Sequence, residues 1–294
     1  MNVSCRVCGQ SEKLIIDTND HSITKEPFSI SLCKRCGFGV TLKVPGSESI
    51  GRYYQSEVYI SHSDTKKGWI SLLYHIIRNV MLERKYKLIL KFTKGKKLLD
   101  VGSGTGYFGG FMKSKGYLVH GVEIDANAAK LSKEKFGISP MLPDEFLCSD
   151  EDANYDVITL WHVMEHLSDL QSWWTKLYNS LNHNGVLIIA IPNHSSYDAE
   201  YYDSYWAGYD VPRHMWHWTP FSFGIMANRH FFEIIYMEDM PFDPFYNSLL
   251  SEKYMKRTMG QLRAFFIGLR ALLHGKRNVE KSSSVIYVLK KQPI

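Results

Sequence analysis

Apolar and polar positions change their spacing several times along the middle of the chain. Short apolar runs that read as buried strands are each followed by a segment whose apolar positions recur at helical spacing. The predicted order is a strand over 97–101, a helix over 108–115, a strand over 118–123, a helix over 126–136, a strand over 155–161, a helix over 170–181 and a strand over 186–191. Strands that alternate with helices in this way indicate βαβ units, so we expect a doubly wound, mostly parallel α/β sheet.

Three further segments complete this pattern. Strand-like runs over 234–237 and 285–290 predict an antiparallel edge strand, and a helical pattern over about 69–92 predicts a long helix before the sheet. The sequence has no run of about 18 apolar residues and no basic segment leading into an apolar one near residue 1. We therefore expect a cytoplasmic protein with neither a membrane span nor a secretory leader.

The charge of the chain is concentrated in one segment. Of 35 basic and 30 acidic residues, residues 253–277 hold seven basic and no acidic ones, so the rest of the 294 residues carries a net charge of −2. A nucleic-acid-binding protein would spread its basic residues over the main domain, so we expect no stable nucleic-acid partner. The same segment has the spacing of an amphipathic helix, which fits either peripheral contact with an anionic membrane, at its inner face, or docking on the sheet or a second subunit. The oligomeric state stays open.

Two Cys-x-x-Cys pairs stand near the N-terminus, Cys5 with Cys8 and Cys33 with Cys36. Without a secretory leader, paired knuckles of this kind indicate a tetrahedral zinc site more than disulfides. Four thiolates leave no open position on the metal, so the zinc would be structural. Residues 1–44 are therefore predicted to form a zinc ribbon with short strands over 13–17, 28–32 and 38–42, and 45–96 to form a linker and a helical segment covering the cofactor.

The most informative stretch runs from Asp100 to Gly106, where a strand enters a glycine turn that opens a helix. The predicted ligand-binding residues of the turn are Asp100, Gly102, Ser103, Gly104, Thr105 and Gly106. A Walker loop would need Gly-Lys-Ser/Thr, and the NAD fingerprint would need glycine where Tyr107 stands. The turn therefore differs from both.

A second strand ends in the carboxylate of Glu123, followed by Ile124, about 20 residues later. An acid in that place binds the ribose hydroxyls of an adenosine ligand. Asp100 could attract the ammonium group of an amino-acid-like ligand. Together these features describe adenosine joined to a zwitterion, which fits S-adenosylmethionine.

These residues resemble the first and second motifs of class I S-adenosylmethionine-dependent methyltransferases, and 155–167 and 181–192 resemble the fourth- and fifth-strand segments of that family. The resemblance covers about 97–192. It implies a Rossmann-like fold, S-adenosylmethionine as cofactor and a methyltransferase domain over 97–294, with an acceptor-binding insert at about 193–222 and the basic amphipathic helix at about 253–277.

The segment from Trp161 to His166 begins at the end of the predicted strand over 155–161, at the sheet edge where ligands bind. As a bare string, His162-x-x-Glu165-His166 matches an inverted zinc-protease pattern, but that pattern needs a continuous helix. The stretch is also similar to the E-x-x-E-H segment of ubiquinone-pathway O-methyltransferases, which is implicated there in holding a divalent cation. We expect Trp161 and His162 to line the cofactor pocket and Glu165 and His166 to face the acceptor; the alternative is a helix start with locally satisfied polar groups.

The predicted insert is rich in aromatic rings, and it looks like the W-x-G-x-D-x-P-R-H-x-x-H segment of relatives tied to polysaccharide pathways. The predicted acceptor-binding residues are Trp206, Tyr209, Arg213 and His217. Arginine binds phosphate in a bidentate manner, and aromatic faces suit sugars or bases. His214 is the predicted general base, because histidine ordinarily titrates near neutral pH. The alternative is an aromatic lid packed on itself.

Tyr54 and Tyr59 precede the core, as do the aromatic residues that cover the cofactor in similar enzymes; core packing is the equal alternative. We therefore expect methyl transfer to a small molecule or saccharide, with a sugar nucleotide or lipid-linked glycan favoured. A zinc-ribbon RNA methyltransferase or nucleic-acid binder is the alternative, followed by an NAD-dependent oxidoreductase.

Overall fold

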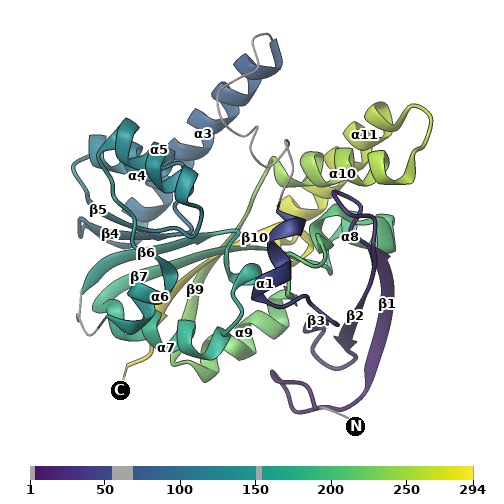
Figure 1. Ribbon diagram of the computed structural model, residues 1–294, viewed down its shortest axis with the longest axis horizontal. Helices are drawn as coiled ribbons and strands as arrows, with labels where there is room; N and C mark the ends of the chain where they lie inside the picture. The colour runs from purple at the N-terminus through teal and green to yellow at the C-terminus, as the bar shows by residue number, and fades with distance from the viewer. Residues whose placement is uncertain (1–3, 55–68, 150–153, 294) are drawn as a thin grey trace. The chain divides into compact units, whose positions relative to one another are not determined.

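The computed structural model describes residues 4–54, 69–149 and 154–293 (Figure 1). The chain divides into two compact units. The ribbon unit comprises Met1–Ser56, His162–Ser168 and Ile189–Val288, and the glycine-turn unit comprises Glu57–Trp161, Asp169–Ile188 and Leu289–Ile294. These units are defined by compactness, so the functional boundaries predicted from the sequence stay a prediction.

The central sheet has six strands in the order β5-β4-β6-β7-β10-β9. In that order, the strands are β5 (Leu118–Val122), β4 (Lys97–Val101), β6 (Tyr155–Trp161), β7 (Leu181–Pro192), β10 (Ser284–Lys291) and β9 (Phe232–Asp239). β4 pairs in parallel with both neighbours, with Val101 level with Val122 on one side and Leu160 on the other. The late strands β9 and β10 form the antiparallel edge. The predicted Rossmann-like α/β fold is confirmed.

The helices of the glycine-turn unit follow the predicted alternation. They are α3 (Trp69–Phe92), α4 (Tyr107–Ser114), α5 (Ala126–Phe136), α6 (Pro143–Cys148) and α7 (Leu170–Ser180). Local signals fix the ends of α5: the Asp125 carboxylate accepts a hydrogen bond from the Ala128 N–H, and Gly137 ends the helix in the left-handed conformation. α4 begins immediately after Gly106, so the glycine turn opens directly into a helix N-terminus.

The ribbon unit contains a second sheet, in the order β1-β2-β3-β8. Its first three strands, β1 (Lys13–Asn19), β2 (Pro27–Cys33) and β3 (Gly39–Thr41), lie where the sequence predicts them. The fourth, β8 (Trp216–His217), comes from the predicted acceptor-binding insert and pairs with β3 in antiparallel fashion, Val40 opposite Trp216. The ribbon and the insert therefore share one sheet.

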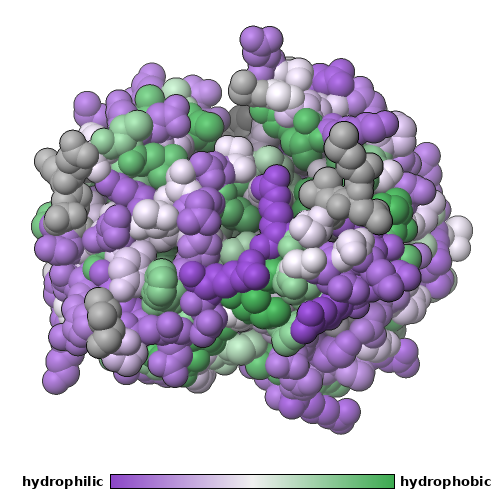
Figure 2. Space-filling model, turned by 90° about the horizontal axis from the view of Figure 1, so that it is seen from below, coloured by the Kyte–Doolittle hydropathy of each residue, from purple (hydrophilic) through white to green (hydrophobic). Residues whose placement is uncertain are grey.

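Helices of the ribbon unit lie mostly in the second half of the chain. They are α1 (Ser47–Ile50), α8 (Tyr197–Tyr202), α9 (Pro220–Arg229), α10 (Asp243–Met255) and α11 (Gly260–Arg277). One hydrophobic core joins Ile30 and Leu32 of β2 to Trp206, Tyr209 and Ile267. On the face of the molecule shown in Figure 2, hydrophilic residues predominate and hydrophobic ones appear between them in small groups.

Candidate functional site

The turn between β4 and α4 has a backbone that requires glycine. Gly102, Gly104 and Gly106 have φ angles of 70°, 53° and 80°. Residues that carry a side chain rarely adopt such positive φ angles. A Cβ built on Gly104 would meet no atom within 4 Å, whereas one on Gly106 would lie 2.3 Å from Ser132 Oγ. The turn is therefore open at Gly104 and packed against α5 at Gly106.

Two carboxylates flank this turn, as the sequence predicts. Glu123 accepts hydrogen bonds from the Gly104 N–H (2.6 Å) and the Asp125 N–H (2.9 Å). Asp100 is 2 % exposed and accepts a hydrogen bond of 2.7 Å from the Thr159 hydroxyl. Burial raises the pKa of Asp100 to about 6; the Thr159 bond and the charge of Lys85 oppose the rise, and the charge of Glu123 adds to it.

Polar atoms without partners mark the surroundings of the turn. Among the described residues, Ser103 Oγ and Trp161 Nε1 are buried and have no hydrogen-bond partner. A buried donor left without a partner costs free energy, so these atoms suit a polar ligand. Thr105 is half-buried, and the side chain of Ile124 is 78 % exposed.

Lys85 of α3 was not foreseen from the sequence. Its ammonium nitrogen lies 4.0 Å from the centre of the Trp161 ring and 5.4 Å from that of Phe108. Its charge also lowers the pKa of Asp100. A lysine within a helical pattern carries no signal that sets it apart from other surface lysines.

A second group of side chains, the histidine cluster, belongs to the ribbon unit and consists of His162, Glu165, His166 and His214. Glu165 is fully buried, and neither of its carboxylate oxygens has a hydrogen-bond partner among the described residues. His162 Nδ1 lies 3.4 Å and His214 Nε2 lies 4.0 Å from Glu165 Oε1. Ligand atoms of Glu165, His166 and His214 lie within 4.8 Å of one another, so these three could together hold a metal ion.

Backbone carbonyls fix the tautomers of two of these histidines. His214 Nδ1 lies 2.9 Å from the Gly208 oxygen, and His166 Nδ1 lies 3.0 Å from the Arg213 oxygen. A carbonyl only accepts, so each Nδ1 carries the proton and each neutral ring keeps a lone pair on Nε2. The structure therefore orients Nε2 of His214 as a proton acceptor beside the Glu165 carboxylate.

The charges within the cluster follow from burial, from the Glu165 carboxylate and from the neighbouring Asp243. Burial lowers the pKa of His162, but Asp243, with Oδ2 3.0 Å from Nε2, and Glu165 outweigh it and raise the pKa to about 10. Burial and the charge of His214 lower the pKa of His166 to about 4. Burial raises the pKa of Glu165, but its histidine neighbours outweigh it and the net shift is downward. At neutral pH the cluster thus holds a protonated His162, an ionised Glu165 and a neutral His166.

Arg213, the predicted acceptor ligand, lies buried among groups of the protein itself. Its guanidinium is 3 % exposed and donates to both carboxylate oxygens of Asp210 (2.7 and 2.9 Å), to Asp20 (3.0 Å) and to the Tyr53 carbonyl (2.7 Å). These partners use its donors inside the protein. Arg213 instead ties the insert to the loop after β1.

The other predicted acceptor ligands are also buried. Trp206 and Tyr209 lie in the hydrophobic core with Ile30, and the indole N–H of Trp206 donates to Asp198 (2.8 Å). His217 is buried in β8, with Nε2 2.8 Å from the Thr41 hydroxyl. These three rings of the insert are therefore core, because the ribbon packs over them.

His162, predicted to line the cofactor pocket, has its two ring nitrogens beside Glu165 and Asp243. Tyr54, a predicted cofactor ligand, lies beside the histidine cluster, with its hydroxyl 3.5 Å from His166 Nδ1. Tyr59 lies outside the described residues. Glu165, expected to face the acceptor, is fully buried and contacts histidines instead. Asp243 carries no motif that could have predicted its contact with His162.

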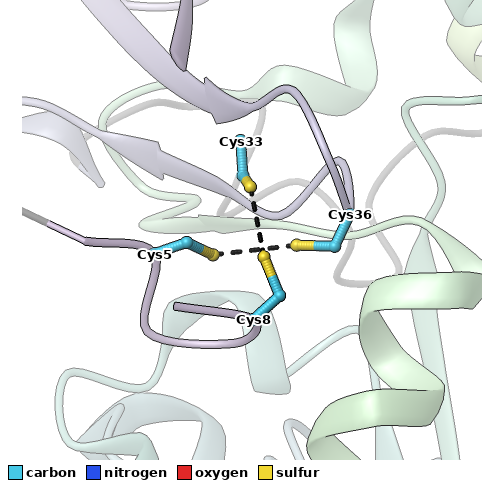
Figure 3. A group of neighbouring side chains, drawn as sticks. All are labelled: Cys5, Cys8, Cys33 and Cys36. Atoms are coloured by element: carbon cyan, nitrogen blue, oxygen red, sulfur yellow. Dashed lines mark hydrogen bonds between the residues drawn. The ribbon is translucent and has the colours of Figure 1, made fainter. Parts of the chain in front are cut away.

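The four N-terminal cysteines converge on one point (Figure 3). Cys5 Sγ lies 3.7 Å from Cys36 Sγ, and Cys8 Sγ lies 3.4 Å from Cys33 Sγ, with all four sulfurs within 4.8 Å of one another. A disulfide would bring two sulfurs to about 2.05 Å. The separations instead approach the edge of about 3.8 Å in a tetrahedron whose metal–sulfur bonds are about 2.3 Å.

Comparison with known proteins identifies the family. A family described as "Methyltransferase domain" matches residues 74–236, more than half of the chain. The chain belongs to this methyltransferase family. The match includes the glycine turn, both flanking carboxylates and the whole histidine cluster.

Individual relatives of this methyltransferase are distant. A ubiquinone biosynthesis O-methyltransferase of Glaesserella parasuis is 27 % identical over 35 % of this chain and 48 % of its own length. A 23S rRNA (uracil(747)-C(5))-methyltransferase of Pyrococcus abyssi is 25 % identical over 35 % of this chain and 23 % of its own length. This chain thus spans about half or less of the curated relatives. A solved SAM-dependent methyltransferase from Archaeoglobus fulgidus, 19 % identical with a TM-score of 0.51, covers 76 % of this chain and 100 % of its own, and shares the fold.

Proposed function

We propose that this protein transfers a methyl group from S-adenosylmethionine to a small-molecule acceptor. The observation that carries the proposal is the open glycine turn with Asp100 and Glu123 beside it. Membership of the methyltransferase family supports the reaction class.

The residues around the turn fit this cofactor. Glu123 would accept hydrogen bonds from ribose hydroxyls, and ionised Asp100 would attract the ammonium group. The buried and unpartnered atoms Ser103 Oγ and Trp161 Nε1 offer hydrogen-bonding groups, and Gly104 leaves room for close approach. When bound, the cofactor supplies an electrophilic methyl group on a positively charged sulfur.

We infer that His214 removes the proton from the acceptor atom as that atom gains the methyl group. The proton moves to Nε2, because Nδ1 already donates to the Gly208 carbonyl. The imidazolium that forms is stabilised by the buried Glu165 carboxylate, 4.0 Å away. Glu165 thus acts through His214 as a positioning residue, and His166, with its lowered pKa, stays neutral beside it.

A saccharide acceptor is the finer part of the proposal. The insert rings that the sequence predicts as acceptor ligands are buried and do not support a saccharide acceptor. The support comes from a cavity of about 870 Å³ in the ribbon unit. Its lining includes Asp17, Asn19, Glu26 and Tyr205. Carboxylate and amide groups bind sugar hydroxyls, and an exposed tyrosine ring offers a face for stacking. The same lining includes Lys43 and Arg52, whose positive charges suit the diphosphate of a sugar nucleotide or lipid-linked glycan.

We also infer that the four cysteines hold a structural zinc ion. The sulfur separations and the all-thiolate ligand set suit tetrahedral zinc, and such a set leaves no position for a substrate. The metal would stabilise the sheet that carries β8.

The test is release of S-adenosylhomocysteine from S-adenosylmethionine in the presence of sugar nucleotides. We expect His214→Ala to lower kcat by roughly 10²-fold or more while leaving cofactor affinity unchanged, because it removes only the proton acceptor. His183→Ala, which removes an exposed histidine at the start of β7, is the matched control. Unchanged turnover in His214→Ala would remove this residue from the role of base.

Other acceptors and cofactors are distinguished in the same assay. RNA fragments replace the sugar nucleotides in one arm, because one relative carries an rRNA methyltransferase name. Methylation of RNA alone would favour the RNA methyltransferase interpretation. Binding of NADH in place of S-adenosylmethionine would favour an oxidoreductase.

A further inference from the structure

Apart from the buried Ile267, helix α11 presents mainly small residues to the protein, and several of its large apolar residues are exposed. Its buried positions are Ala264, Ile267, Gly268, Ala271 and Gly275. The side chains of Leu262, Phe265, Phe266 and Leu273 are 49–54 % exposed. A surface helix normally turns its large apolar side chains toward the core, so this arrangement needs another explanation.

The small residues allow α11 to approach its neighbour closely. α11 packs against α10 (Figure 1), and a Cβ on Gly268 would lie 2.7 Å from the Phe245 ring. The packing of α11 therefore uses one face of small residues. The Phe265 ring also lies 6.0 Å from the Phe245 ring of α10, whereas Leu262, Phe266 and Leu273 keep about half of their surface exposed among the described residues and form an apolar surface there.

Helical geometry places the exposed residues in two parallel stripes. At about 100° per residue, Leu262, Phe266 and Leu273 fall within about 40° of one direction, opposite the buried face. Arg263, Arg270 and Arg277 recur every seven residues and fall along one border of that apolar stripe. An apolar stripe edged by arginines suits a surface that is apolar inside and anionic at its boundary.

The charge around this helix favours an anionic partner over a second copy of the chain. Residues 253–277 hold seven basic residues and no acidic one, and Met259, in the turn before α11, is 73 % exposed. Arg263 faces the buried Glu252 at 3.6 Å, and Lys276 pairs with Asp239 at 2.9 Å, but the other five have no such ion pair among the described residues. Two copies joined through this face would bring these like charges together.

We propose that α11 docks on a lipid bilayer containing anionic lipids. The apolar stripe enters the boundary between headgroups and acyl chains, and the arginine stripe lies against lipid phosphates. Within the described part of the chain, no helix has the length and apolar character needed to cross a membrane. Docking would therefore be peripheral, and it does not depend on the proposed reaction.

Co-sedimentation of the full chain with vesicles tests the proposal. We expect binding to phosphatidylcholine vesicles that contain about one-third phosphatidylglycerol, and weak binding to pure phosphatidylcholine. The double variant Leu262→Ser/Phe266→Ser should weaken binding to the anionic vesicles at least about tenfold. Arg270→Ala/Arg277→Ala should weaken it by a similar factor and reduce its salt dependence.

Matched controls separate this surface from general effects. Phe221→Ser removes an exposed phenylalanine of α9, and Lys130→Ala/Lys133→Ala removes two exposed charges of α5; both should bind as the unmodified chain does. Thermal unfolding checks that the α11 variants fold, as expected for exposed side chains. Absence of binding to anionic vesicles, or equal binding by the α11 variants and controls, would overturn the proposal. So would a dimer that the Leu262→Ser/Phe266→Ser variant abolishes.

Discussion

The fold buries the Asp100 side chain, and burial disfavours the ionised form of its carboxyl group. Its pKa is raised from 3.8 to about 6, mainly by burial, so the charged form is less stable in the folded than in the unfolded chain. A raised pKa on an acid contributes stability below pH 3.8 that is lost as the pH rises through about 6. At neutral pH the folded protein therefore carries a penalty of roughly 3 kcal/mol at this residue. We interpret this loss of stability as the consequence of keeping the Asp100 carboxylate buried and ionised where it can bind a cationic group.

Asp100→Asn should separate stability from binding. The amide keeps the volume and a hydrogen-bond acceptor for Thr159 but cannot ionise, so the free energy of unfolding at pH 7.5 should rise by about 1–3 kcal/mol. The difference from the unmodified chain should shrink as the pH falls from about 6 toward 4. The affinity for S-adenosylmethionine should fall, because the ammonium group loses its partner.

Chemical denaturation and calorimetric titration at pH 4.5 and 7.5 measure both effects. Asp144→Asn, at the exposed start of α6, is the matched control. A variant that is less stable than the unmodified chain at pH 7.5 would contradict the view that this carboxylate is strained by burial.

At the scale of single residues, the sequence identified the glycine turn and its acids because a strand, a turn and a second strand place them locally. The sequence did not reveal that Arg213, Trp206, Tyr209 and His217 are buried. Arginine, tryptophan and histidine look the same in a binding site and in a core. Trp206, Tyr209 and His217 are buried against strands β2 and β3, more than 170 residues earlier in the chain, and Arg213 is buried against Asp20 and Tyr53, also far away in sequence. No local pattern encodes these contacts.

The ribbon supports the histidine cluster through contacts between elements. The Thr41 hydroxyl donates to the His214 carbonyl (2.7 Å), and the Thr219 hydroxyl donates to the Cys36 carbonyl (2.9 Å). β3 pairs with β8, which begins two residues after His214. A metal that orders the ribbon would therefore also order the backbone around the proposed base.

Cys36→Ser should lower turnover and the Tm while leaving the affinity for S-adenosylmethionine within about twofold, because the cofactor residues lie in the other unit. Cys148→Ser, at an exposed cysteine outside the cluster, is the control. Elemental analysis should find one zinc per unmodified chain and less in Cys36→Ser. Equal behaviour of the two variants would argue against a structural metal.

At the scale of elements, regular spacing made the parallel sheet and its helices predictable. The three ribbon strands were also predicted, because the cysteine knuckles mark their ends. The two-residue strand β8 was not, since two residues carry no periodicity. Its pairing with β3 is what turns the insert from a surface loop into part of the core.

For the molecule as a whole, the sequence predicted the fold class and located the surplus charge in residues 253–277, which include α11. It left open which way α11 faces, because apolar positions on two sides of one helix fit docking on either side. The exposure of Leu262 and Phe266, opposite a face of small residues, resolves the direction. The contrast between the buried small residues and the exposed large residues of α11 can be recognised only in the structure, where α11 packs against α10.

The central claim is that Glu123 and Asp100 bind S-adenosylmethionine at the glycine turn. Native mass spectrometry of the intact chain, mixed with equal amounts of S-adenosylmethionine and NADH, tests it most directly. The account predicts an adduct with the mass of S-adenosylmethionine. In Glu123→Ala its affinity should be at least about tenfold weaker, because the ribose hydroxyls lose a charged acceptor, whereas the control Glu134→Ala, an exposed acid of α5, should retain it. An NADH adduct instead, or an equally strong S-adenosylmethionine adduct in Glu123→Ala, would contradict the account.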